Sequence, residues 1–323
     1  MKIYICLILY FFTATSIDAQ ELYPICEPAS NVPKGTLGVR VFDESYKEVS
    51  IYRHMFGIKL MYGLTPKLSI YVSACMSNHH SPVLPVGLTT HTHSGNKTIY
   101  TTGNITRGVQ YPYEFNGDDL YIKYRFVTSD GQNSHFRMAA YGELSYVNEA
   151  HDETEPTLLD DNSGFGAGII TTYLIHHFAA TFTTGIVLPV AYNGYAPDPY
   201  GGADVATKLV YGNAVIYNLS FGYLLYPRHY KNYSQTNWNV YIEFMGKSYG
   251  EAKVYQGPQM VSSPILTPLL QAGNYIEIYP GIQCIIKSDL RIDFSIGYPF
   301  LGTSYVRFYP VYMFGIQRYF YGK

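Results

Sequence analysis

The chain has 323 residues, with 22 Lys and Arg against 24 Asp and Glu, which gives a formal charge of −2. Charged residues make up only 14% of the chain, whereas about 25% is usual for a soluble domain. This near-neutral balance, with no run of Lys or Arg, argues against nucleic-acid binding. Tyrosine accounts for 35 residues, and its apolar ring and polar hydroxyl suit a boundary between membrane and water.

Residues 1–19 have the pattern of a secretory signal peptide. A positive start is followed by ten apolar residues over 3–12 and by smaller, more polar residues up to Ala19. A helix that spans a membrane needs roughly 17–25 apolar residues, so this run is too short to be an anchor. We therefore expect export and cleavage after Ala19. Residues 20–35 contain prolines and no alternation, and we interpret them as an N-terminal leader.

From residue 36 onward, apolar and polar residues alternate with a period of two, which predicts β-strands with one apolar face. Near the start, Phe56, Ile58 and Leu60 lie on the face opposite Lys59. The strands predicted in this way are 36–43, 56–62, 68–76, 120–126, 135–146, 164–175, 178–188, 203–212, 215–226, 238–247, 275–286, 290–298 and 306–316.

Two folds produce this alternation: a soluble β-sandwich that buries its apolar face, and a membrane barrel that turns that face to lipid. Strands of this length suit a barrel, because a tilted strand needs about 9–11 residues to cross the hydrocarbon. Charged residues also lie in mid-strand, always opposite the apolar set. Short and long connections alternate along the chain, as in outer-membrane barrels. We therefore predict an all-β fold, a single antiparallel up-and-down transmembrane β-barrel over residues 36–323.

The number of strands follows from parity. Thirteen strands are clear, but a barrel with both termini on one side needs an even number. The strands 238–247 and 275–286 would otherwise run in the same direction, and an additional strand near 252–262 corrects this. We expect 14 strands, with 12 as the alternative.

Charged residues on the polar faces of the strands are predicted to line the lumen. They comprise eight basic and four acidic side chains, and such a mixture either closes the pore as a charge network or forms a polar channel. Both alternatives remain open from the sequence. The residues are Lys59, Lys123, Arg125, Arg137, Glu143, Lys208, Glu243, Lys247, Glu277, Arg291, Asp293 and Arg307.

A histidine-rich loop is the candidate metal site. His79, His80, His91 and His93 follow Met76 within a long predicted loop. Imidazole ligands suit zinc, copper or nickel, and a nearby methionine adds a preference for Cu(I). The alternative is an extracellular loop in which histidine is merely a polar residue.

An acidic loop over 148–163 is a second candidate for ion binding. Its carboxylates would bind Ca²⁺ or bridge through divalent ions to lipopolysaccharide, although no EF-hand spacing is present. A solvated loop is the alternative reading. The expected partners are outer-membrane lipid, lipopolysaccharide and a small-molecule solute, and we expect no cofactor.

Enzymatic activity is not expected. The Ser and His pairs His80-Ser81 and Ser134-His135 are sequence neighbours, and adjacent side chains on a strand point to opposite faces. A catalytic serine needs a histidine within hydrogen-bonding distance on the same side. The sequence also contains no phosphate-binding loop, CxxC or HExxH motif.

Two regions of the chain resemble a known family. The sequence FGIKLMYGLTPKLSI over 56–70 is similar to the strand–turn–strand pattern YGLTDRLSV of the outer-membrane proteins associated with the meta-pathway of phenol degradation (MetA-like transporters). The segments YPGIQ (279–283), LRID (290–293) and GYP (297–299) resemble the penultimate hairpin of that family. The resemblance implies passage of small, often hydrophobic, molecules across the outer membrane.

These observations lead to one main functional hypothesis and one alternative. The chain is expected to be a porin-like channel or transporter in the outer membrane of a Gram-negative cell. The alternative is a non-transporting structural or surface-binding barrel whose long outer loops bind a ligand or metal.

Overall fold

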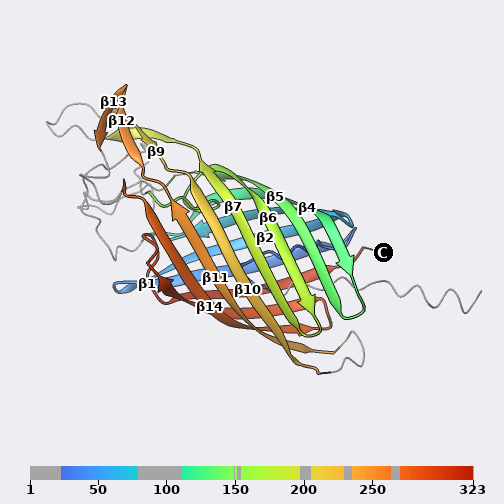
Figure 1. The fold of residues 1–323 in the computed structure, drawn as a ribbon. Coiled ribbons are helices and arrows are strands. Elements are labelled where there is room, and N and C mark those ends of the chain that lie inside the picture. The colour runs from blue at the N-terminus through green and yellow to red at the C-terminus, as the bar shows by residue number, and fades with distance from the viewer. Residues whose placement is uncertain are drawn as a thin grey trace, which may run out of the picture.

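The computed structural model describes residues 23–78, 111–148, 150, 154–196, 205–228, 235–262 and 270–322. Within these ranges, twelve antiparallel strands form a closed barrel (Figure 1). The barrel strands are β1 (Leu37–Glu48), β2 (Ile51–Thr65), β3 (Leu68–Ser77), β4 (Glu114–Asp130), β5 (Ser134–Val147), β6 (Gly164–Ile175), β7 (Phe178–Pro189), β10 (Ala214–Tyr226), β11 (Asn237–Tyr249), β14 (Gly273–Ile286), β15 (Leu290–Leu301) and β16 (Val311–Phe320).

The first and last strands close the barrel. Leu37 at the start of β1 pairs with Phe320 at the end of β16, while the other edge of β1 pairs with β2. Both chain ends of the barrel therefore lie at one end, called here the terminal end. The turns 66–67, 176–177 and 287–289 are also at the terminal end, and the opposite end, called here the loop end, carries most of the long connections. The ten-residue connection 227–236 is an exception at the terminal end.

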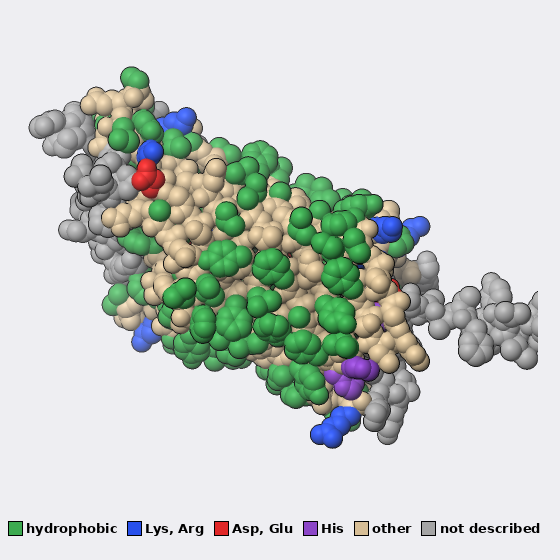
Figure 2. Space-filling view, viewed as in Figure 1, with side chains coloured by type: hydrophobic (Ala, Val, Ile, Leu, Met, Phe, Trp, Pro, Cys, Tyr) green, Lys and Arg blue, Asp and Glu red, His purple; other side chains and the backbone are tan. Residues whose placement is uncertain are grey.

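Alternation along each strand separates an apolar exterior from a polar interior. Ile58 on the outer face of β2 is 44% exposed, whereas Lys123 on the inner face of β4 is 0% exposed. Hydrophobic side chains are spread over the barrel exterior that is visible in Figure 2. A wall that is apolar outside and polar inside is the pattern of a transmembrane barrel, because only lipid favours so much exposed hydrocarbon.

The prediction of 14 strands is wrong, and the alternative of 12 is confirmed. The segments that suggested additional barrel strands form β9 (Val205–Val210), β12 (Lys253–Gln256) and β13 (Gln259–Ser262). Together with β8 (Tyr192–Ala196) they make a separate four-stranded sheet beyond the loop end (Figure 1). These strands have four to six residues, fewer than the about nine needed to cross the hydrocarbon.

Tyrosine rings thicken the inner wall of the barrel. Tyr71, Tyr121 and Tyr141 stack in a row across β3, β4 and β5, with ring centroids 5.5 and 5.0 Å apart. On the opposite wall, the Tyr241 ring lies flat over Gly281, where a Cβ atom would come within 2.3 Å of the ring. These four tyrosines therefore narrow the lumen rather than mark the membrane boundary.

None of the described residues forms a helix that is long and apolar enough to cross a membrane.

Candidate functional site in the barrel lumen

The N-terminal segment, residues 23–36, lies inside the barrel. Its backbone amides donate hydrogen bonds to side chains of strands on different sides of the wall. Val32 N donates to Ser69 Oγ on β3 at 3.1 Å, and Ala29 N donates to Thr172 Oγ1 on β6 at 2.9 Å. Cys26 N donates to Glu243 on β11 at 2.8 Å. A segment that reaches three separated strands must cross the lumen.

The segment enters at the terminal end and reaches the middle of the barrel. Ser69 is the second residue of β3, whereas Glu243 lies midway along β11. Followed from residue 36 toward the N-terminus, the chain then turns back. Tyr23 packs in one cluster with Tyr241 and with Ala179, which lies near the terminal end. The residues around Glu27 therefore form the apex of a loop inserted from the terminal end.

Glu27 at this apex binds two lysines of the wall. Its carboxylate lies 3.3 Å from Lys59 Nζ and 3.2 Å from Lys123 Nζ. Lys123 also donates to the carbonyl of Pro28 at 2.8 Å and lies 5.2 Å from the centre of the Tyr71 ring. A fully buried ammonium is costly unless it is paired and hydrogen-bonded, so Glu27 stabilises the charge of Lys123.

Glu243 holds the apex from the opposite wall. This fully buried carboxylate accepts hydrogen bonds from Ile25 N, Cys26 N and the hydroxyl of Ser220. The segment and the wall therefore both donate hydrogen bonds to the Glu243 carboxylate, and a buried carboxylate requires such donors. Nearer the terminal end, Arg137 Nη1 donates to Ser30 Oγ at 2.9 Å.

The loop end has a second closure, made by residues 154–163. Glu155 in this loop is buried and accepts hydrogen bonds from Tyr275 Oη at 2.7 Å, Ser304 Oγ at 3.0 Å and Tyr305 N at 2.8 Å. Lys247 Nζ lies 3.3 Å from its carboxylate. Burial raises the pKa of Glu155, but the charges of Lys247 and Arg307 outweigh it and leave the pKa lowered.

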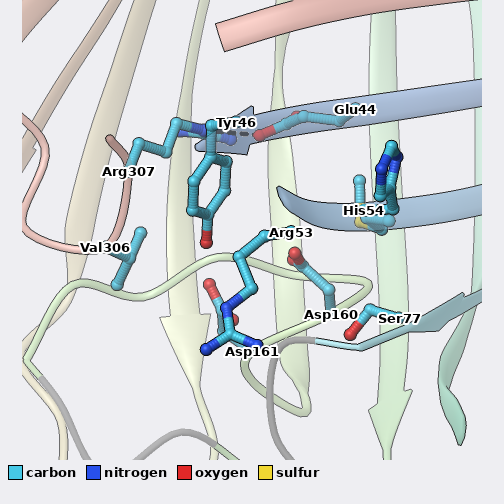
Figure 3. Close-up of a pocket in the computed structure, with 10 residues that line it drawn as sticks. Glu44, Tyr46, Arg53, His54, Ser77, Asp160, Asp161, Val306 and Arg307 are labelled. Atoms are coloured by element: carbon cyan, nitrogen blue, oxygen red, sulfur yellow. Dashed lines mark hydrogen bonds and ion pairs between the residues drawn. The ribbon is translucent and has the colours of Figure 1, made fainter. Parts of the chain in front are cut away.

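A small cavity of about 20 Å³ lies beside this loop, where Asp160 and Asp161 meet Glu44, Arg53 and Arg307 (Figure 3). This volume is enough for about one water molecule. Arg307 Nε donates to Glu44 at 2.7 Å. Burial, followed by the nearby charges of Asp161 and Glu44, raises the pKa of the Asp160 carboxyl well above its usual range.

The charged residues predicted to line the lumen fall into three groups. Lys208 lies on β9 in the outer sheet, so its assignment to the lumen was wrong; the alternation of 203–212 belongs to a strand outside the barrel. Arg307 precedes β16 rather than lying on it, yet it reaches Glu44 and Glu277. The structure places the remaining ten on the inner faces of barrel strands: Lys59, Lys123, Arg125, Arg137, Glu143, Glu243, Lys247, Glu277, Arg291 and Asp293.

Sequence reasoning missed several partners of these residues. Glu27, Arg40, Glu44 and Glu155 all contribute ion pairs inside the barrel, and Arg40 forms two hydrogen bonds to Asp293 at 2.7 and 2.8 Å. The excess of basic over acidic residues in the predicted lumen was the available signal. Unpaired buried cations are costly, so that excess implied that carboxylates outside the predicted strands neutralise them.

The predicted metal ligands His79, His80, His91 and His93 lie outside the described residues. Within the part of the chain that the structure describes, no group of three or more His, Cys, Asp or Glu side chains is arranged to hold a metal ion.

No family model matches this chain, and no curated protein matches its sequence. Its fold is similar to that of an outer-membrane channel from Pseudomonas putida F1, with 11% identity, a TM-score of 0.55 and coverage of 91% of this chain and 100% of that chain. OprD from Pseudomonas aeruginosa is similar at 7% identity, with a TM-score of 0.34 and coverage of 92% and 98%. LpxR from Salmonella typhimurium is similar at 6% identity, with a TM-score of 0.38 and coverage of 89% and 100%. The likeness to the P. putida channel shows a shared barrel fold.

Proposed function

We propose that the chain is exported to the outer membrane and acts there as a channel for small solutes, with the N-terminal segment as a displaceable plug. The observation that supports this role is the kind of contact that holds the segment. Its backbone amides donate hydrogen bonds to polar side chains of the wall, and its apex is held by ion pairs. When the segment leaves, water that enters the lumen can form hydrogen bonds to the polar groups it uncovers, whereas the hydrogen-bond ladders of the barrel strands cannot be exchanged without unfolding the wall.

The likeness to an outer-membrane channel also supports a channel role, since that protein has a barrel of the same fold. The apolar exterior supports a membrane location, and the signal-peptide pattern of residues 1–19 supports export. The role predicts that solutes pass only when the N-terminal segment leaves the lumen.

A disulfide between the segment and the wall tests this role. Cysteines at Ala29 and Thr172 would join two residues that are already hydrogen-bonded, in a background where Cys26, Cys75 and Cys284 are serine. Liposomes containing the oxidised protein should not swell in small sugars or amino acids, and reduction should restore swelling. The matched control pairs cysteines at Thr172 and Thr181, whose hydroxyls lie 2.8 Å apart on neighbouring wall strands.

Swelling that is equal before and after reduction would contradict a displaceable plug. The second candidate function, a structural barrel that does not transport, has one observation in its favour: the lumen is closed by both the N-terminal segment and the 154–163 loop. That candidate predicts no swelling in either redox state.

A further inference from the structure

A chamber of about 190 Å³ lies in the lumen between the two closures. Ile25 of the N-terminal segment contributes to one side, and Lys247, which binds Glu155 of the 154–163 loop, lies on another. The remaining walls come from β1, β10, β11, β14 and β16. The chamber therefore lies on the path that a solute would follow through the barrel.

The walls of the chamber are mainly apolar and adaptable. Ile25, Ile216, Met245 and Met313 line it together with the rings of Tyr275 and Tyr279. Methionine side chains are flexible and polarizable, so they fit ligands of varied shape. Close packing normally fills such a space inside a protein. An apolar space of this size is therefore suited to holding a guest.

The charges around the chamber cancel. Two carboxylates, Glu44 and Glu277, and two cations, Lys247 and Arg307, line it. Arg307 pairs with Glu44 at 2.7 Å and with Glu277 at 3.7 Å, while Lys247 pairs with Glu155 at 3.3 Å. An anionic or cationic guest would bring a charge without a free counter-charge, and burial of an unpaired charge is strongly unfavourable.

Size then limits the guest. An apolar cavity of about 150 Å³ holds one benzene molecule, so a chamber of about 190 Å³ has room for a single ring with a short substituent. Asn218 at the wall offers a neutral amide beside this space; its Oδ1 accepts from Gly246 N at 3.3 Å.

We propose that the chamber binds one small uncharged molecule with a ring-sized apolar body and a single hydrogen-bonding group. This inference rests on the proposed channel function, for which it names the class of solute. The guest contacts Ile25, so its binding also stabilises the position of the N-terminal segment.

Three probes with the same ring test this inference: benzyl alcohol, benzoate and benzylammonium. Equilibrium dialysis at pH 7.5 of the full chain in detergent, against the same detergent alone, measures binding without requiring transport. Benzyl alcohol should bind at one site, at least tenfold more tightly than either charged analogue. Crystals soaked in 3-bromobenzyl alcohol should show anomalous density for bromine in the chamber.

A filled chamber should lose this binding. Ile216→Trp places a large ring in the chamber, and Val215→Trp, on the lipid-facing side of the same strand, is the matched control. The first variant should weaken benzyl alcohol binding at least tenfold, and the control should bind as the wild type does. Met313→Phe is a second, smaller filling variant should Ile216→Trp fail to fold.

Equal binding of the charged analogues, or unchanged binding in both filling variants, would overturn the inference. Liposome swelling separates it from the proposed function. Binding without permeation contradicts the channel and supports the chamber, whereas permeation of benzyl alcohol without saturable binding contradicts the chamber.

Discussion

Glu27 in the N-terminal segment lies 3.2 Å from the ammonium group of Lys123, a residue that is fully buried in the barrel wall. The two residues are separated by 96 positions in the sequence. This contact joins the N-terminal segment to a charge that is fixed in the wall. Displacement of the segment would therefore expose Lys123 to an empty lumen, where only water could replace its partner.

The first prediction concerns this pair. Glu27→Gln keeps the size of the side chain but removes its charge, and we expect it to release the N-terminal segment more often. The loss should be about 1–3 kcal/mol, less than for a fully buried pair because Glu27 is partly exposed. Single-channel recordings should show a higher open fraction, with a lower thermal midpoint of the folded barrel.

The control for this prediction is Lys34→Gln, which removes a charge from an exposed side chain of the same segment. It should leave the open fraction unchanged. In a double-mutant cycle, Glu27→Gln combined with Lys123→Met should cost less than the sum of the two single changes. Additive effects would show that the two residues act independently.

The second prediction tests which face of the wall contacts lipid. Phe294 lies on the outer face near the middle of β15, and Leu301 lies on the outside at the loop end of the same strand. Phe294→Arg should destabilise the folded barrel by about 2–4 kcal/mol in a bilayer, and Leu301→Arg by about 0–1 kcal/mol. Urea titration followed by the electrophoretic shift of folded barrels measures both. Equal small effects would place water, not lipid, around Phe294.

The alternation of single strands was enough to predict the two faces of the wall. In β4, Leu120 and Ile122 are exposed while Lys123 and Arg125 are buried, as their parity requires. The alternation does not show, however, whether a strand belongs to the barrel. The short strands β9 and β12 alternate in the same way in the separate sheet outside it. The error in strand number and the misplacement of Lys208 have this common cause.

The position of residues 23–36 inside the barrel could not be predicted from periodicity, because this segment has no repeating structure. Their positions depend on single hydrogen bonds to distant strands, such as Ala29 N to Thr172 and Val32 N to Ser69. Only the closed barrel brings those acceptors together. The surplus of lumen cations indicated that acids were missing, but it did not indicate that Glu27 and Glu155 supply them.

The third prediction concerns the closure at the loop end. Glu155→Gln removes the charge that Lys247 and Arg307 stabilise. The pKa of Glu155 is lowered in the folded protein, so its contribution is complete above the unfolded value of about 4.3 and is lost as the pH falls through the folded value. The thermal midpoint of the variant should therefore be lower than that of the wild type at pH 7.5, and the two should converge in strong acid. A difference that persists there would point to lost hydrogen bonds rather than lost charge.

The fourth prediction concerns Asp160 in the same loop, whose replacement should stabilise the folded protein rather than destabilise it. Burial and the nearby negative charges of Asp161 and Glu44 raise the pKa of Asp160 in the folded protein. Its ionised form therefore destabilises the folded state at pH values above the raised pKa, and this penalty disappears below the unfolded pKa of about 3.9. Asp160→Asn should raise the thermal midpoint at pH 7.5, by roughly 2–4 °C for each kcal/mol gained.

The gain from Asp160→Asn should shrink as the pH falls, because protonation gives wild-type Asp160 the same neutral state. Asp289→Asn, in the 287–289 turn at the terminal end, is the control and should not raise the midpoint, since Asp289 faces Arg318 at 3.7 Å. Thermal unfolding from pH 3.5 to 8 measures both variants. A gain that is independent of pH would mean that the asparagine acts through packing, and the assignment of charge repulsion to Asp160 would fail.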